Sequence, residues 1–180
     1  MKEEINRTIK ILKEGGVILY PTDTIWGIGC DATNSHAISQ IFKLKRREDN
    51  KALISLVANK EQLKGITGYI PNLDITKQPT TIIYPSAVTL NKKLLSKDGS
   101  AAIRIVQDKF CQEIITKIGK PIVSTSANIS GESSPTKFSE ISEDIKQNVD
   151  YIVNLRKNEI MTKASTILII NKDGSKTKIR

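Results

Sequence analysis

The spacing of apolar residues along the chain predicts helices that alternate with short strands. In the first segment, three apolar residues recur at spacings of four and three, the period of one helix face: Ile5, Ile9 and Leu12. Gly15-Gly16 follows as a helix stop, and an apolar strand is predicted at 17–20. Further helices are predicted from Ser35, after Asn59, over 109–118 up to Gly119, and from Thr136 through Ile145. Further strands are predicted at 52–57, 81–84, 101–106, 121–125, 151–154 and 165–170.

The order of these elements indicates an α/β fold. Strands that alternate with helices are typical of this class, and about half a dozen strands with several short connections favour a mixed parallel and antiparallel sheet. A chain of 180 residues is long enough for one domain with a real core and short for two. We therefore predict a single domain over residues 1–170, built on a twisted mixed sheet with flanking helices, and a frayed C-terminal tail over 171–180.

Composition excludes several classes of protein. Apolar residues make up 38% of the chain, and no apolar run approaches the ~18 residues of a membrane span. The first residues, Met1–Ile5, lack the apolar stretch of a signal peptide, so we expect a cytoplasmic protein with no membrane partner. Two cysteines, Cys30 and Cys111, cannot form a disulfide framework, and a single histidine, His36, excludes most zinc sites.

The net charge points to an anionic partner. Lys and Arg together number 28 against 19 Asp and Glu, a formal charge of +9, which favours polyanions such as RNA or a nucleoside triphosphate. Several cations gather where one predicted helix ends: Lys45, Arg46, Arg47 and Lys51. This group suits a triphosphate, and the alternative is a solvated run of cations at a helix C-terminus. No Walker A sequence occurs, so ATP would be held in another manner.

Two polar segments follow predicted strands, where open α/β sheets tend to bind ligands. The first, 21–29, sets hydroxyls, a carboxylate and Trp26 among glycines and is predicted to be a ligand loop; the alternative is a turn with Trp26 as a core anchor. The second, 124–131, carries four hydroxyls and an amide, which lets phosphates approach the backbone; the alternative is a Ser/Thr-rich turn. No Rossmann context surrounds the glycines at 27–29, and no GxSxG elbow surrounds Ser124.

Taken together, these segments resemble the YrdC-type threonylcarbamoyl-AMP synthases in their short, single-domain form. The matching blocks are 21–31, Lys45-x-Arg47-x-x-x-Lys51, Pro79 with Thr81 ahead of Pro85, Arg104 within 102–105, 124–131 with Pro135-Thr136, and Ser165-Thr166. The resemblance implies a nucleotidyltransferase that joins L-threonine, bicarbonate and ATP into threonylcarbamoyl-AMP and releases pyrophosphate. It also implies that the domain over 1–170 is catalytic and has a basic concave cavity on one face of its sheet.

The resemblance also implies a set of site residues. Three cations are expected to be catalytic, by neutralising the triphosphate and the leaving pyrophosphate: Lys45, Arg47 and Lys51. Arg104 is expected to hold the threonine carboxylate bidentately, with Thr22 and Trp26 contacting threonine. The nucleotide and carbamate are expected to lie against a further set: Thr81, Ser124, Ser126, Asn128, Ser165 and Thr166.

The implied chemistry needs no side-chain nucleophile. Mg²⁺ is expected to accompany ATP, and no protein ligand for a metal is identified. The product would pass to a separate tRNA-modifying complex that makes N6-threonylcarbamoyladenosine beside the anticodon. The sequence departs from the family at Lys77-Gln78-Pro79, which replaces a usual Pro-Gly-Pro turn with a bulkier, cationic one.

Two other functions stay open at this point. A non-catalytic protein that binds structured RNA, such as a tRNA or rRNA, fits the net charge, although an aromatic content of 4% disfavours stacking on single strands. An enzyme of the dihydroxybutanone-phosphate synthase type needs an acidic metal cluster, and the sequence shows none.

Overall fold

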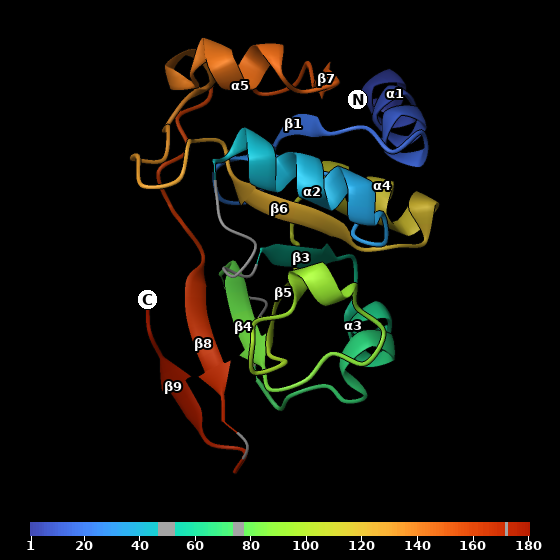
Figure 1. Cartoon of the computed structure of the whole chain (residues 1–180), viewed down its shortest axis with the longest axis vertical. Helices are drawn as coiled ribbons and strands as arrows, with labels where there is room; N and C mark the ends of the chain where they lie inside the picture. Colours follow the sequence, from blue (N-terminus) through green and yellow to red (C-terminus); the bar gives the residue numbers. More distant parts are fainter. Residues whose placement is uncertain (47–52, 74–77, 172) are drawn as a thin grey trace.

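The apolar periodicities produce five α-helices and nine strands within the residues that this computed structural model describes, 1–46, 53–73, 78–171 and 173–180 (Figure 1). The helices are α1 (Lys2–Lys13), α2 (Ser35–Leu44), α3 (Lys60–Thr67), α4 (Lys109–Ile118) and α5 (Glu143–Gln147), with 3-10 turns η1 (Lys92–Leu94) and η2 (Phe138–Glu140). The strands are β1 (Ile18–Pro21), β2 (Trp26–Gly29), β3 (Ile54–Val57), β4 (Thr80–Tyr84), β5 (Ala101–Ile105), β6 (Ile122–Ser126), β7 (Tyr151–Ile152), β8 (Thr166–Ile170) and β9 (Lys176–Lys178).

These strands form one mixed sheet in the order β7-β1-β2-β6-β3-β5-β4-β8-β9. The pairs β7/β1, β3/β5 and β4/β8 are parallel, and the other neighbours are antiparallel. Strand β6 lies between β2 and β3 and pairs antiparallel with both, so it joins the two halves of the sheet. The predicted α/β class with a mixed sheet and flanking helices is confirmed.

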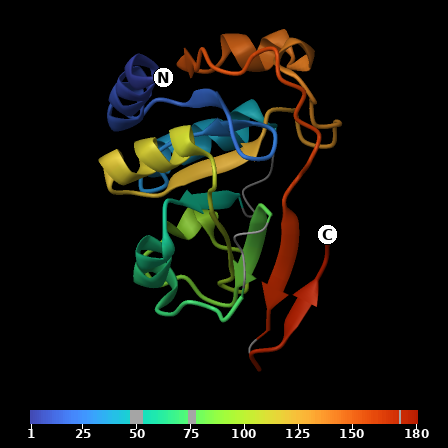
Figure 2. The same ribbon diagram turned by 180° about the vertical axis from the view of Figure 1, so that it is seen from behind.

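Each face of the sheet carries its own hydrophobic core. Along β1, Ile18 and Tyr20 belong to one core and Leu19 to the other, which is the alternation of a strand buried on both faces. Helices α1 and α4 pack on the first core, and α2 packs on the second. Figure 1 shows α2 in front of β6, and Figure 2, seen from behind, brings the yellow helix α4 to the front. In the part of the chain that the structure describes, no helix is long and apolar enough to cross a bilayer.

The helix ends follow the predicted capping signals with one correction. Asn59 caps α3 by accepting a hydrogen bond from the Gln62 amide, and Gly119 ends α4 in the left-handed conformation, both as predicted. Asn34, and not Ser35, caps α2. The Asn34 side-chain oxygen accepts from two free amides at the start of the helix, whereas the Ser35 hydroxyl accepts from the Asn91 side chain instead.

The predicted helix from Thr136 through Ile145 is wrong. That segment holds the short turn η2 and then α5, which begins at Glu143 after its cap, Ser142. The Thr136 amide and hydroxyl both donate to the Glu140 carboxylate, at 2.8 and 2.9 Å, so Thr136 closes a turn and does not start a helix.

Two segments predicted to be irregular are strands. Residues 26–29, predicted as part of a ligand loop, form β2 and pair with β1, which confines the loop to the residues between these strands. Residues 176–178, predicted as part of a frayed tail, form β9 and pair antiparallel with β8. The hairpin signal Asp173-Gly174 precedes this strand, and Gly174 has the positive φ of 82° that such turns require.

Gly29 in β2 lies too close to neighbouring groups to carry a side chain. A Cβ atom on Gly29 would lie 2.5 Å from the Val123 carbonyl oxygen and 2.7 Å from the Tyr20 ring, so only glycine allows this close approach. Gly65, inside α3, has no atom within 4 Å of its Cβ position.

We therefore predict opposite effects for two Gly→Ala substitutions. Gly29→Ala should lower the free energy of unfolding by about 3 kcal/mol, because backbone and an aromatic ring must move to admit the methyl group. Gly65→Ala should raise it by about 1 kcal/mol through helix propensity. Urea denaturation of the two variants measures both changes, and a Gly29→Ala protein as stable as the parent would contradict the packing described.

Candidate active site

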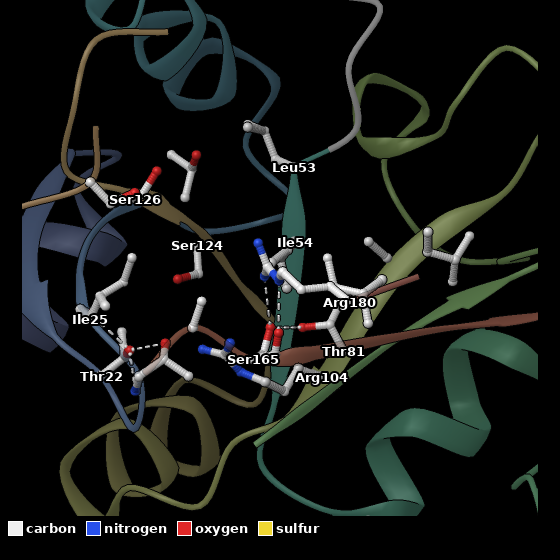
Figure 3. Close-up of a pocket in the computed structure, with 17 residues that line it drawn as sticks. Thr22, Ile25, Leu53, Ile54, Thr81, Arg104, Ser124, Ser126, Ser165 and Arg180 are labelled. Carbon is white, nitrogen blue, oxygen red and sulfur yellow. Dashed lines mark hydrogen bonds between the residues drawn. The ribbon is translucent and has the colours of Figure 1, made fainter. Parts of the chain in front are cut away.

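A cavity of about 320 Å³ opens where β6, β3, β5, β4 and β8 present one face of the sheet (Figure 3). Hydroxyl groups, short apolar side chains and two arginines line it. The lining residues are Thr22, Thr24, Ile25, Leu53, Ile54, Thr81, Ile83, Ala102, Arg104, Ser124, Thr125, Ser126, Ser134, Ala164, Ser165, Ile167 and Arg180.

Arg104 brings a buried positive charge to this cavity from β5, one residue before the strand ends. Its side chain is 3% exposed, and its Nη2 atom lies 3.1 Å from Oδ1 of Asp23, whose other oxygen accepts from the Gln107 amide at 3.0 Å. The Nε–H group of Arg104 is buried and has no hydrogen-bond partner among the described residues. A buried charged donor without an acceptor is costly, so this geometry favours a ligand that supplies an anionic oxygen.

The turn between β1 and β2 is held by its own hydroxyls. The Thr22 hydroxyl donates to the Ile25 carbonyl at 2.8 Å, accepts from the Thr24 amide at 3.0 Å, and lies 2.9 Å from the Thr24 hydroxyl. Because its proton is used inside the turn, Thr22 sets the shape of the cavity wall, and the lone pairs of Thr24 stay available to a ligand.

A second polar group lies where β4 and β8 meet. The hydroxyls of Thr81 and Ser165 are 2.8 Å apart, and Arg180 donates from Nε to the Ser165 carbonyl at 3.0 Å and from Nη2 to the Ser165 hydroxyl at 3.4 Å. Arg104 and Arg180 thus extend into the same cavity from β5 and from the segment after β9 (Figure 3). Two guanidinium groups in one cavity suit a ligand with more than one anionic group.

Ser124 and Ser126 enter the cavity from β6. They lie two positions apart on one strand and therefore point to the same face. Gly27 sits opposite Ser126 in the β2/β6 pair, and a Cβ on it would be 3.2 Å from the Ser124 hydroxyl. The missing side chain leaves both serine hydroxyls room to meet a ligand.

Lys45 stabilises the loop that follows these serines. Its side chain is 2% exposed, and Nζ donates to the carbonyls of Ser126 and Asn128, at 2.6 Å each. The Ser130 amide in turn donates to the Lys45 carbonyl. Lys45 therefore reaches the site through the backbone of the 126–130 loop and is not among the cavity-lining residues. The predicted partners Arg47 and Lys51 lie outside the described residues.

Three other predicted site residues do not line the cavity. Trp26 is fully buried on β2 and packs against Phe138, with ring centroids 5.0 Å apart, so its side chain occupies the core. The Asn128 side chain donates to the carbonyls of Ile129 and Glu132 and shapes the loop. Thr166 alternates with Ser165 and Ile167 along the strand and faces away from the cavity, toward Gln78.

The buried thiols and the tyrosine near the site stay neutral. Burial raises the pKa of Cys30 and of Cys111, so neither thiol is poised to become a thiolate nucleophile. Burial also raises the pKa of Tyr20, whose hydroxyl donates to the Val123 carbonyl. Among the described residues, the polar groups that line the cavity are therefore arginines and hydroxyls.

Sequence reasoning missed two charged residues of the site. Asp23 was visible as a carboxylate in the first polar segment, but its pairing with Arg104 is a tertiary contact that no spacing indicates. Arg180 was assigned to a frayed tail. The Asp173-Gly174 signal followed by Lys176-Thr177-Lys178 was sufficient to predict the hairpin that carries Arg180 back toward β8.

Fold and site together define an α/β protein whose cavity is lined by two arginines, one of them buried, and by several hydroxyl groups. The chain belongs to the Sua5/YciO/YrdC family, whose model, described as "Telomere recombination", matches residues 10–180. A threonylcarbamoyl-AMP synthase from Psychromonas ingrahamii is 34% identical over 155 residues, which cover 82% of this chain and 81% of that protein. The Escherichia coli K12 protein of the same name is 33% identical over 138 residues, covering 72% and 73%.

Solved structures share the fold. A doubly substituted Sua5 from P. abyssi superposes with a TM-score of 0.88 at 25% identity; the match covers all of this chain and 56% of that one. A P. abyssi Sua5 complexed with L-threonine gives 0.85 at 23% identity and 54% of its length. E. coli YciO gives 0.85 at 22% identity and 89% of its length. The synthase names of the two bacterial relatives indicate that this chain is an enzyme of the nucleotidyltransferase type.

We predict that Lys45 contributes to both stability and turnover. Lys45→Ala removes the buried ammonium that bonds the part-buried carbonyls of Ser126 and Asn128, so the free energy of unfolding should fall by about 2–4 kcal/mol. Because the 126–130 loop then loses its shape, turnover should also fall by at least about tenfold. Lys43→Ala, an exposed lysine on α2, should change neither quantity. Thermal denaturation together with a rate assay tests this, and an unchanged melting temperature in Lys45→Ala would contradict the role described.

Proposed function

We propose that this cavity forms threonylcarbamoyl-AMP from L-threonine, bicarbonate and ATP, with release of pyrophosphate. The observation that carries the proposal is the buried Nε–H of Arg104, which has no acceptor among the described residues. A substrate carboxylate supplies that acceptor, and guanidinium groups recognise carboxylates with planar, charge-assisted hydrogen bonds. The identity of over 30% to named threonylcarbamoyl-AMP synthases supports the same reaction.

Threonine is the substrate expected at Arg104. The related Sua5 was crystallised with L-threonine, and the wall beside Arg104 is built of the small Thr22–Ile25 turn. The carboxylate would bind Arg104, and the amine would then point toward the hydroxyls of Thr24, Ser124 and Ser126. Asp23 holds the guanidinium from behind and fixes its direction.

The phosphates of ATP are expected near the other arginine of the cavity. Arg180 supplies a guanidinium there, beside the hydroxyl pair of Thr81 and Ser165. Lys45 would keep the β6 loop in the shape that meets the phosphates. Arg47 and Lys51 remain predicted phosphate ligands on the strength of their positions in the family motif.

The reaction brings two anions together. The threonine amine attacks the carbon of bicarbonate, and a carbamate forms as water is lost. A carbamate oxygen then attacks the α-phosphorus of ATP: the new O–P bond forms, and the bond to the bridging oxygen breaks as pyrophosphate leaves with the electron pair. The buried Arg104 and the exposed Arg180, both lining the cavity, would offset the repulsion between carbamate and triphosphate.

Mg²⁺ would enter with the nucleotide. The described residues hold no group of three or more His, Cys, Asp or Glu side chains able to bind a metal, so the triphosphate is the expected source of its ligands. The product would be consumed by a tRNA-modifying complex, and a net charge of +9 is compatible with contact to tRNA. For this role the chain is expected in the cytoplasm, where tRNA and all three substrates occur.

The proposal predicts that pyrophosphate release depends on every substrate. With ATP, L-threonine and bicarbonate present, the enzyme should release pyrophosphate steadily, and omission of either threonine or bicarbonate should abolish release. The measurement is a coupled pyrophosphate assay with each substrate withheld in turn. Release that is indifferent to threonine would overturn the proposal.

A variant at Arg104 tests in the same assay whether this residue binds the threonine carboxylate. Arg104→Lys keeps the charge and loses the planar fork, so the KM for threonine should rise by about tenfold or more. Arg7→Lys, an exposed arginine on α1, serves as the matched control and should leave the KM unchanged.

A further inference from the structure

Arg156 lies outside the cavity yet is bonded to the turn that forms its wall. Its Nη1 atom donates to the Thr22 carbonyl at 3.0 Å and to Oδ2 of Asp108 at 2.9 Å, and its Nε donates to Glu159 at 2.7 Å. One guanidinium thus ties three segments together: the β1–β2 turn, the start of α4 and the chain between β7 and β8. Arg156 is absent from the cavity lining.

The topology explains how Arg156 reaches Thr22. Strand β7 runs parallel to β1, and the Val153 amide donates to the Leu19 carbonyl. The chain continues beside β1, so Arg156, three residues beyond Val153, comes level with Thr22, three residues beyond Leu19. Parallel pairing of two short strands therefore delivers the arginine to the outer side of the turn.

The backbone at Arg156 is held in a disfavoured conformation. Its φ of +55° is in the left-handed region, which residues with a Cβ rarely adopt. Such a conformation persists when the surroundings fix it, and the three acceptors of the guanidinium do so here. A residue that only solvated the surface would have no reason to keep this strain.

The acceptors of Arg156 are themselves connected to the site. Asp108 caps α4, its other oxygen accepting from the Cys111 amide at 2.9 Å. The preceding residue, Gln107, donates its amide to Asp23, which pairs with Arg104. Arg156 therefore fixes the β1–β2 turn relative to the β5–α4 corner, and those two segments carry the Thr22 turn and the Asp23–Arg104 pair.

We propose that Arg156 is a positioning residue for the amino-acid half of the site. It acts through the Thr22 carbonyl and Asp108, holding the turn so that Thr24 and the Asp23–Arg104 pair present a fixed surface to the substrate. The effect on threonine rests on the proposed function, whereas the effect on the turn does not. Loss of the guanidinium should loosen the turn and weaken threonine binding more than it slows turnover.

The first arm of the test uses the ligand-free protein. Amide hydrogen exchange is measured at Thr24 and Gln107, whose amides donate to the Thr22 hydroxyl and to Asp23. In Arg156→Gly, which keeps φ accessible and removes the guanidinium, exchange at both amides should accelerate by about tenfold. Exchange unchanged from the parent would overturn the proposal.

The second arm uses threonine-dependent pyrophosphate release. Arg156→Gly and Arg156→Lys should each raise the KM for threonine about tenfold with kcat changed by less than about threefold. Asp108→Asn, which can still cap α4, should shift the KM in the same direction by a smaller factor. Arg7→Ala, the exposed control, should leave exchange and KM unchanged.

The two arms separate the possible failures. Faster exchange with an unchanged threonine KM would overturn the positioning role. A lower melting temperature and a lower kcat with no change in KM would show that Arg156 serves stability alone, and this outcome also overturns the proposal. If the parent enzyme released no pyrophosphate in response to threonine, the proposed function would fail, and the exchange arm would still decide whether Arg156 holds the turn.

Discussion

The double hydrogen bonding of β6, to β2 on one side and β3 on the other, is the constraint on which the site depends. It joins the two parts of the sheet, β7-β1-β2 and β3-β5-β4-β8-β9, and it fixes the direction of Ser124 and Ser126. Strand β2 can approach β6 because glycines at 27 and 29 present no side chain to it. Lys45 then holds the carbonyls of the loop that follows. The packing of β6 between its two neighbours thereby determines where the polar groups of the site lie.

The buried guanidinium of Arg104, which has one donor without an acceptor, is the feature that makes this cavity suited to an anionic ligand. Burying a charge is costly unless it is paired, and Asp23 pairs with only part of the Arg104 fork. Asp23 holds the guanidinium before any ligand arrives, and because the Nε atom itself is buried, an anionic oxygen reaches its N–H only when neighbouring side chains shift. In a reaction between two anions, that preorganisation is worth more than a mobile surface cation, because the protein has already met the cost of ordering it.

The sequence was sufficient for the elements that local signals specify and insufficient for contacts made across the sheet. Capping by Asn59 and the end of α4 at Gly119 follow from short-range chemistry, and both were predicted. The family resemblance also predicted Arg104 as a site residue, and Arg104 lines the cavity. The sequence left open whether Trp26 is a core residue or part of a ligand loop. Its ring partner, Phe138, is distant in sequence, so no local pattern indicates their contact. The same limit applies to the Asp23–Arg104 pair.

The most direct test of this account is a crystal structure of the chain with L-threonine bound. The account predicts that the threonine carboxylate accepts a hydrogen bond from Nε of Arg104, with its amine toward Ser124 and Ser126 and the Asp23–Arg104 pair intact. Threonine bound elsewhere, with Nε of Arg104 still lacking an acceptor, would contradict the central claim that this buried donor defines the substrate site.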